Sequence, residues 1–327
     1  MARCERGARM RVAVCVATYR RPDPLAQLLE SLSRLSFRKR PEPMIVVVVV
    51  DNDAAGSARE VVALARRRLR WPVAYVVEPE QGISHARNRA VAVALGRGAD
   101  FVAFVDDDEV VSDAWLDELL DAQARYGADI VAGPAIPRFE AGTPRWVVRG
   151  RFFEHPRHAT GTPVAFAATN NVLIAVRVLR APEAAFDERF GRTGGEDTHF
   201  SMRARRRGAR MVWADRAVVE DAVPRGRATA RWILQRHFRQ GNAMVWCERA
   251  VLRDRSWVAV RIAKAVGRIG QGVLLLPLGV VRGRAGVVAA LCRVVRGVGA
   301  LCALWGVRYE EYVAKPAPAA RAAERAG

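Results

Sequence analysis

The sequence predicts an α/β fold, in which a Rossmann-like, mostly parallel sheet is flanked by helices and followed by a C-terminal helical, membrane-associating extension. Three observations lead to this fold class. Short apolar runs alternate with helical patterns over residues 1–135, polar residues follow directly on several of these runs, and the last part of the chain is both apolar and basic. Strands separated by helices pair in parallel through right-handed crossovers.

Five apolar runs are predicted as strands of this sheet, at residues 11–17, 44–50, 73–77, 101–105 and 129–132. Between them, Asp23-Pro24 is predicted to cap a helix that carries leucines on a single face. Ser84 is predicted to cap another helix, with Gly96 just beyond its end. No Gly-x-Gly-x-x-Gly or P-loop motif follows the first run, which argues against dinucleotide binding and P-loop chemistry.

The remainder of the chain divides into three parts, at residues 136–255, 256–315 and 316–327. The first part begins irregularly. It then contains a predicted strand at 170–176, a helix at 196–207, a strand at 211–214 and a long helix at 229–252. The second part is apolar, basic and helical, and the last, rich in Ala, Pro and Arg, is predicted to be disordered.

The net charge of +19 is concentrated towards the C-terminus, where residues 225–327 hold 19 Lys and Arg but only 5 Asp and Glu. A basic, apolar tail favours an anionic membrane surface or nucleic acid. No signal peptide is apparent, and the 5 cysteines have no paired or metal-type spacing. We therefore expect reduced thiols and a cytoplasmic protein.

Asp106-Asp107-Asp108-Glu109 directly follows the apolar run at residues 101–105. Four carboxylates at the carboxyl end of a buried strand repel one another unless a cation lies among them, and ligands of open α/β sheets bind at that edge. Hard oxygen donors suit Mg²⁺ or Mn²⁺. The alternative is an acidic loop that opens the next helix, with Ser112-Asp113 as its N-cap; it explains Asp113 but not the acids before it.

Two further strand ends carry polar residues. Thr18-Tyr19-Arg20-Arg21 follows the first run, and Asp51-Asn52-Asp53 follows the second. Each segment alone could be an ordinary turn. Together with the acidic segment they indicate one polar crevice along the edge of the sheet.

These motifs, with those further along the chain, resemble family 2 glycosyltransferases, and most of all the glucosyltransferases that extend bacterial exopolysaccharides such as succinoglycan. The similarity spans about residues 10–245. The matching segments, in order, are Thr18-Tyr19-Arg20-Arg21-Pro22, Asp51-Asn52-Asp53, Gly82-Ile83-Ser84-His85-Ala86-Arg87-Asn88, Asp106-Asp107-Asp108-Glu109, Gly194-Gly195-Glu196-Asp197 and Gln235-Arg236-His237-Phe238-Arg239-Gln240-Gly241.

The resemblance implies a GT-A fold, a nucleotide-sugar donor (most often a UDP-sugar), a divalent metal ion and inversion at the anomeric carbon. It makes residues 1–135 the half that binds the nucleotide sugar and residues 136–255 the half that binds the acceptor and carries catalysis. Carried over by position, the donor-binding residues are Asp51 on the base, Thr18 and Arg20 in the nucleotide pocket, Asp106 near the ribose, and Arg87, Arg236 and Arg239 near the diphosphate or sugar.

The same carry-over makes Asp197 the general base and gives Glu196 a part in placing the acceptor. Single-displacement inversion needs one base to take the proton of the acceptor hydroxyl. On its own, this acidic pair could simply be two residues at a helix N-terminus that favour the macrodipole.

Asp106 and Asp108 form the Asp-x-Asp pair implied as metal ligands. Relatives usually carry a His after the strand that follows the catalytic helix, and here Glu220 occupies that place. A carboxylate can replace imidazole as a ligand of Mg²⁺ or Mn²⁺. Glu220 is therefore the third expected metal ligand.

Residues 269–281 and 285–307 are apolar but interrupted by Pro277, Arg293 and Arg296. A membrane span needs about 20 apolar residues. Interfacial helices with snorkelling arginines are favoured over a membrane hairpin or a soluble helical pair. The expected location is the inner face of the cell membrane, where the acceptors of this family are often lipid-linked.

Two other functions compete with this interpretation. A sugar-nucleotide nucleotidyltransferase would carry a Gly-rich loop and a Lys after the first strand, where this chain has Ala17-Thr18-Tyr19-Arg20. A nucleic-acid-binding protein would fit the charge, but no nucleic-acid motif is recognisable. We therefore expect a nucleotide sugar, a saccharide or lipid-linked acceptor and an anionic membrane surface as partners, and no nucleic acid.

Overall fold

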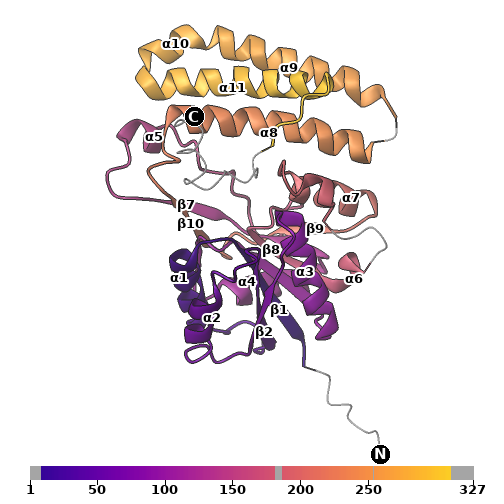
Figure 1. The fold of residues 1–327 in the computed structure, drawn as a ribbon. Coiled ribbons are helices and arrows are strands. Elements are labelled where there is room, and N and C mark those ends of the chain that lie inside the picture. The colour runs from indigo at the N-terminus through magenta and orange to yellow at the C-terminus, as the bar shows by residue number, and fades with distance from the viewer. Residues whose placement is uncertain (1–8, 181–185, 253, 311–327) are drawn as a thin grey trace, which may run out of the picture.

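The computed structural model describes residues 9–180, 186–252 and 254–310, so the predicted disordered segment 316–327 lies outside the described residues. A seven-stranded sheet in the order β3-β2-β1-β4-β8-β6-β9 forms its centre (Figure 1). Its strands are β1 (Arg11–Thr18), β2 (Met44–Asp51), β3 (Val73–Val77), β4 (Phe101–Val105), β6 (Ile130–Ala132), β8 (Asn171–Ala175) and β9 (Met211–Trp213). All seven correspond to predicted strands, with ends that differ by a residue or two.

Only β8 runs against its neighbours, pairing antiparallel with β4 and β6, while the other pairs are parallel. The sheet is therefore mostly parallel, as predicted. A second sheet has the order β5-β10-β7 and lies beyond the carboxyl edge of β4. Its strands are β5 (Glu109–Val111), β7 (Ala135–Phe139) and β10 (Val219–Val223).

Helices cover both faces of the central sheet. They are α1 (Pro22–Ser33), α2 (Arg59–Ala65), α3 (Ile83–Gly96), α4 (Trp115–Tyr126), α6 (Val176–Leu179), the 3₁₀ helix η1 (Glu188–Phe190) and α7 (Glu196–Arg206). The short helix α5 (Arg145–Arg149) lies apart from this sheet, against the C-terminal helices. Two predicted caps need correction. Ser84 lies inside α3, where its hydroxyl donates to the carbonyl of Asp187 at 3.0 Å, and α1 begins before Asp23-Pro24, at Pro22.

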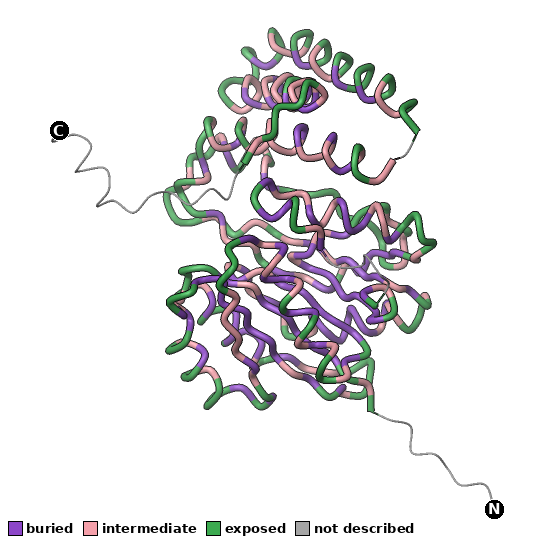
Figure 2. Tube along the Cα trace, turned by 45° about the vertical axis from the view of Figure 1, so that its right-hand side comes forward, coloured by how far each residue is buried: buried purple, intermediate pink, exposed green. Residues whose placement is uncertain are grey.

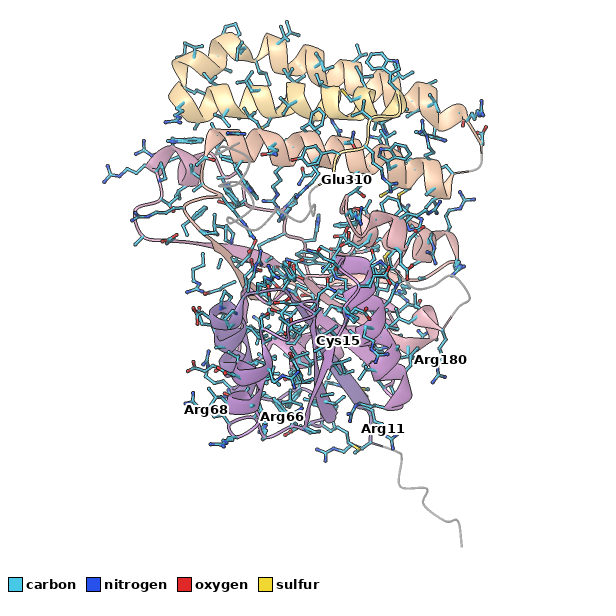
Figure 3. All side chains as sticks on the ribbon, in the orientation of Figure 1. Arg11, Cys15, Arg66, Arg68, Arg180 and Glu310 are labelled. Carbon is cyan, nitrogen blue, oxygen red and sulfur yellow. The ribbon has the colours of Figure 1, made fainter. Side chains whose placement is uncertain are left out.

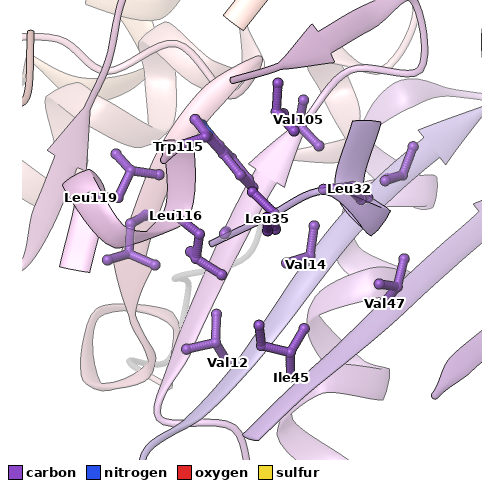
Figure 4. Packing of buried hydrophobic residues seen from close by; sticks show 14 of the residues in the cluster. Val12, Val14, Leu32, Leu35, Ile45, Val47, Val105, Trp115, Leu116 and Leu119 are labelled. Carbon is purple, nitrogen blue, oxygen red and sulfur yellow. The ribbon is translucent and has the colours of Figure 1, made fainter. Parts of the chain in front are cut away.

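The alternation of β1 explains the two layers. Val12, Val14 and Val16 point to one face and pack against α1, α2 and α4, as the leucines and Trp115 in Figure 4 show. Ala13 and Cys15 point to the other face, towards α3 and α7. Because both faces are covered, strands such as β2 consist of continuous valines rather than alternating residues.

The C-terminal part forms three stacked helical layers above the carboxyl edge of the sheet (Figure 1). These are α8 (Ala230–Val251) next to the sheet, α11 (Gly283–Leu304) against it, and α9 (Ser256–Leu274) with α10 (Leu276–Val281) outermost. The apolar stretches predicted at 269–281 and 285–307 thus lie in α9–α10 and in α11, and Pro277 falls in the first turn of α10, where it is tolerated.

Glycines set the close approach of α11 to its neighbours. A Cβ at Gly241 of α8 would overlap the carbonyl of Arg296, and a Cβ at Gly299 of α11 would overlap the carbonyl of Phe238. The outer helix α9 is joined to α8 by an ion pair between Arg261 and Glu248. The extension is therefore packed directly on α8.

Candidate active site

A cleft of about 1200 Å³ lies between the carboxyl edge of the central sheet and α8. Figure 3 shows the side chains that crowd this region between the two layers. Its walls come from the segment after β1, from α3, from the acids after β4, from α7, from β10 and from α8. It therefore collects most of the motifs predicted to act together, although they are far apart in the sequence.

The acids after β4 are held by cations and a hydroxyl. Thr18 Oγ1 donates to Asp107 at 2.7 Å, and Arg21 donates to both Asp107 at 3.2 Å and Asp108 at 3.0 Å. Arg227 approaches Asp108 at 3.4 Å. Arginines thus face the acidic segment from two sides, an arrangement that suits a bound diphosphate.

Burial dominates the titration of this cluster. It raises the pKa of Asp107 to about 6 against the opposing charge of Arg21. Asp106 keeps 41% of its side-chain surface open towards the cleft, yet desolvation by the surrounding protein still raises its pKa, and Asp108 adds to the effect. Glu109 is buried, which raises its pKa well above the usual range. These carboxylates bear more negative charge than their protein surroundings stabilise, so the cluster suits a cation.

Arg87 joins the acidic segment after β4 to helix α7. It is 5% exposed, and it bonds Glu196 on α7 and, at 3.2 Å, Asp106. Burial raises the pKa of Glu196 to about 7, while Arg87 acts in the opposite direction. The Oε2 atom of Glu196 is buried and makes no hydrogen bond among the described residues. Glu196 thus serves to hold Arg87 in place.

Asp197 lines the same cleft from the first turn of α7. Its Oδ1 accepts the N–H of Thr198 at 2.6 Å. Gly195, the N-cap of α7, has φ +94°, a left-handed conformation that side-chain-bearing residues rarely adopt, so the glycine is required for this turn. The turn presents the carboxylate to the cleft.

Arg236 and Arg239 also line the cleft, from α8. The guanidinium of Arg236 lies 5.6 Å from the ring centres of both Phe153 and Trp232. Burial and the charge of Arg239 lower the pKa of Arg236. Two neighbouring cations in a partly enclosed place favour an anionic ligand.

The residues present suit a divalent cation. Asp106 and Asp108 offer hard carboxylate oxygens, which match Mg²⁺ or Mn²⁺. Among the described residues no three His, Cys, Asp or Glu side chains form a complete metal-binding group. Mg²⁺ typically completes such a partial site with substrate phosphates and water.

Two predicted donor residues lie outside the cleft lining. Asp51 is fully buried, and its carboxylate accepts the N–H of Ala58 at 2.7 Å and the hydroxyl of Tyr75 at 2.8 Å, so it shapes the loop after β2. Arg20 has φ +55°, which turns it away to pair with Asp53 at 3.2 Å. In this structure the neighbouring Arg21 and Asn52 line the cleft instead.

Glu220 is likewise not brought to the acidic cluster. It is exposed and pairs with Arg138 at 3.5 Å, whereas Asp221 lines the cleft. Successive residues of a strand point to opposite faces, so the prediction was displaced by one position. Burial raises the pKa of Asp221 to about 6, with Asp108 contributing. The signal was available, because Asp221 is in phase with Val219 and Val223, both buried.

Arg21 and Arg227 are functional candidates that the sequence reasoning missed. Arg21 belongs to a predicted motif, but choosing it over Arg20 required the left-handed backbone of Arg20. Arg227 lies in the turn before α8, between β10, which was not predicted as a strand, and the helix that was predicted at 229–252. No local pattern places it opposite Asp108.

Comparison with known proteins agrees with this geometry. The chain matches the family described as glycosyl transferase family 2 over residues 13–181, and glycosyl transferase family group 2 over residues 101–303. It is 35% identical over 230 residues to the succinoglycan biosynthesis protein ExoM of Rhizobium meliloti (strain 1021), a match that covers 70% of this chain and 72% of that protein.

Solved structures show the same fold. The mannosyltransferase PcManGT from Pyrobaculum calidifontis, in complex with GDP-Man and Mn²⁺, has a TM-score of 0.59 at 18% identity, covering 91% of this chain and 88% of that one. S. aureus TarS 1-349 in complex with UDP has a TM-score of 0.50 at 17% identity, covering 93% and 95%. At these identities the likeness concerns the fold, which is GT-A. The predicted family and fold class are therefore confirmed, and the chain belongs to glycosyl transferase family 2, a nucleotide-sugar-dependent glycosyltransferase.

Proposed function

We propose that the protein is a metal-dependent, inverting glycosyltransferase. It moves a sugar from a nucleotide sugar, a UDP-sugar, to a saccharide or lipid-linked acceptor in the synthesis of an exopolysaccharide or another envelope glycan. The observation that carries this proposal is that Asp106, Asp108 and Asp197 line one cleft. Carboxylates suited to a cation and a separate carboxylate suited to proton transfer thus face the same space.

The donor diphosphate fits the side of the cleft next to the sheet. Asp106 and Asp108, with Asp221 in the place predicted for Glu220, would hold Mg²⁺ or Mn²⁺. When bound, the cation supplies positive charge for the leaving diphosphate. Arg21, Arg87 and Arg227 lie against these acids and would stabilise the same developing charge.

Asp197 would act as the general base. The oxygen of the acceptor hydroxyl forms a bond to the anomeric carbon, while the bond from that carbon to the diphosphate oxygen breaks. The hydroxyl proton passes to the Asp197 carboxylate, and the nucleoside diphosphate leaves with the electron pair. One displacement inverts the anomeric configuration, so an α-linked donor gives a β-linked product.

The class of product and donor is supported by the relatives. ExoM takes part in succinoglycan biosynthesis, and TarS was solved with UDP. A mannosyltransferase of similar fold binds GDP-Man, so a guanine nucleotide is the main alternative donor.

The outer helical layer supports attachment to an anionic membrane. In Figure 2 the outermost helix shows a largely exposed outer side. Its exposed apolar residues are Val260, Ile262, Val266, Val273, Leu274, Leu278, Val280 and Val281. Arg255, Lys264, Arg282 and Arg284 are exposed on or beside the same layer. An apolar face with basic residues around it is typical of helices that lie in a membrane interface.

Within the described residues, α11 has the length and apolarity needed to cross a membrane. However, 39% of its apolar window is buried inside the protein, because α11 packs between α8 and α9. We therefore propose a peripheral protein on the inner face of the membrane, held through α9 and α10.

A screen of nucleotide sugars for hydrolysis and transfer tests the function. We expect turnover of one donor class that stops in excess chelator and returns with Mg²⁺ or Mn²⁺. NMR of the product should show inversion. Full activity in chelator would contradict the metal assignment, and a retained configuration would contradict the single displacement.

A further inference from the structure

Arg296 links the C-terminal extension to the catalytic cleft. It belongs to α11, yet its side chain lines the cleft together with His237 and Gln240 of α8. Its Nε is buried, and among the described residues it has no hydrogen-bond partner. No carboxylate pairs with this guanidinium in the described part of the chain, in contrast to Arg261, which Glu248 neutralises. A charged group placed in this way lacks the partner that would offset its desolvation.

Two other arginines lie near Arg296, of which Arg261 is paired with Glu248 and Arg268 lies further along α9. Burial, followed by the charges of Arg268 and Arg261, lowers the pKa of Arg296. Burial, followed by the charges of Arg296 and Arg236, lowers the pKa of His237 to about 4. His237 is therefore neutral at pH 7 and can donate a hydrogen bond from one ring nitrogen. A guanidinium and an imidazole N–H facing one space suit a phosphate oxygen.

The donor does not account for this group. The carboxylates of the donor side owe their stabilisation to other arginines: Asp106 to Arg87, Asp107 to Arg21, and Asp221 to Arg227 and Arg236. Arg296 approaches from the opposite wall, on the side of the extension. The cleft volume of about 1200 Å³ exceeds the range of roughly 300–1,000 Å³ usual for one small ligand, so a second ligand can lie beside the donor.

The position of Arg296 is rigid. Its own carbonyl faces Gly241 of α8, in a contact that leaves no room for a Cβ, and Gly299 makes a similar contact one turn further along. Helix α11 therefore cannot move away from α8 without losing this packing. This packing fixes the backbone from which the Arg296 side chain reaches the cleft.

We propose that Arg296, assisted by His237, binds the phosphate group of a phosphate- or diphosphate-bearing acceptor. The inference rests on the proposed function and makes it more specific, since it selects an anionic acceptor over a neutral saccharide. It also gives α11 a role in acceptor recognition besides its packing role.

The test uses the full-length protein with excess Mg²⁺ and saturating nucleoside diphosphate, so that the donor side is filled. Calorimetry then compares farnesyl diphosphate with farnesol, probes that differ only in the diphosphate. We expect the wild type to prefer the diphosphate. Arg296→Gln should weaken binding of farnesyl diphosphate about tenfold or more, the effect of losing a charge-assisted hydrogen bond, and leave farnesol unchanged.

Arg284→Gln is the matched control, because it removes the same charge from the same helix at an exposed residue outside the cleft lining. It should bind both probes like the wild type, and Arg296→Lys should retain part of the preference. Equal binding of farnesyl diphosphate by Arg296→Gln and wild type would overturn the proposal. So would a parallel loss of nucleoside diphosphate binding, which would assign Arg296 to the donor. A wild type that binds farnesyl diphosphate but no nucleoside diphosphate would contradict the proposed function and support the anion site.

Discussion

At the scale of single residues, Asp197 is held in a defined orientation. Its Oδ1 accepts the N–H of Thr198 at 2.6 Å and the Thr198 hydroxyl at 3.3 Å. An amide keeps the shape of the side chain but takes up no proton. Asp197→Asn should therefore lower kcat by about 10²–10⁴-fold and leave the Kd of the donor unchanged, as measured by single-turnover transfer and by calorimetry.

Asp215→Asn provides the control for this prediction. Asp215 pairs with Arg157 at 2.8 Å outside the cleft lining, so its replacement should leave transfer intact. If Asp197→Asn weakens donor binding as much as it lowers the rate, Asp197 is a donor ligand and not the base.

Adjacent residues of β10 offer a second test. Asp221 lines the cleft, whereas Glu220 is exposed beside Arg138. Asp221→Asn should weaken Mn²⁺-dependent nucleotide binding about 10-fold or more, while Glu220→Gln should bind like the wild type. Titrations with Mn²⁺ and the nucleotide give both values. The reverse result would restore Glu220 as the predicted metal ligand.

At the scale of secondary-structure elements, the strands were the most predictable features. β2 and β4 are continuous apolar runs because both of their faces are covered, and polar residues end them abruptly. The orientation of side chains after a strand was harder to predict. Arg20 and Arg21 have the same chemistry, and only the left-handed backbone at Arg20 decides which of them reaches the cleft.

The packing of α11 was not predictable from its apolar pattern. Its contact with α8 depends on small residues that meet backbone atoms of the partner helix, such as Gly299 against Phe238. The periodicity of one helix does not identify the helix that it meets. The sequence therefore indicated helices after residue 255 but left open whether they span, lie on a membrane or pack as a pair.

This contact gives a test of stability. Gly299→Ala places a methyl group against the carbonyl of Phe238, so it should lower the free energy of unfolding by about 1–3 kcal/mol. Gly267→Ala is the control, because Gly267 lies in α9 and a Cβ added there would meet no atom within 4 Å. It should raise stability by about 0.5–1 kcal/mol. Urea unfolding of both variants measures the difference, and equal shifts would contradict the tight contact.

At the scale of the whole molecule, the outer layer can be tested without deleting it. Truncation near residue 255 would also remove α11 and expose α8, so point substitutions are cleaner. Replacing the exposed Val266, Leu274 and Val281 by Asp should abolish flotation with anionic liposomes, because it removes apolar contact and adds negative charge.

Leu64→Asp serves as the control, since Leu64 is similarly exposed on α2, far from the C-terminal helices α8 to α11. It should float like the wild type. High salt should weaken but not eliminate the binding of the wild type, because salt screens only the charged part of the interaction. Unchanged flotation of the triple variant would show that another surface binds the membrane.

The stacking of α8, α11 and α9 also sets the distance between the cleft and the outer surface of α9. Helices α11 and α8 separate the side of α9 that is proposed to face lipid from the cleft (Figure 1). Two interaxial spacings of about 8–10 Å each place the reacting groups roughly 20 Å from the bilayer surface. A membrane-embedded acceptor therefore has to project that far before its hydroxyl meets Asp197. The stacked helices would then favour long acceptors, in which the phosphate bound at Arg296 lies well away from the membrane anchor, over short ones.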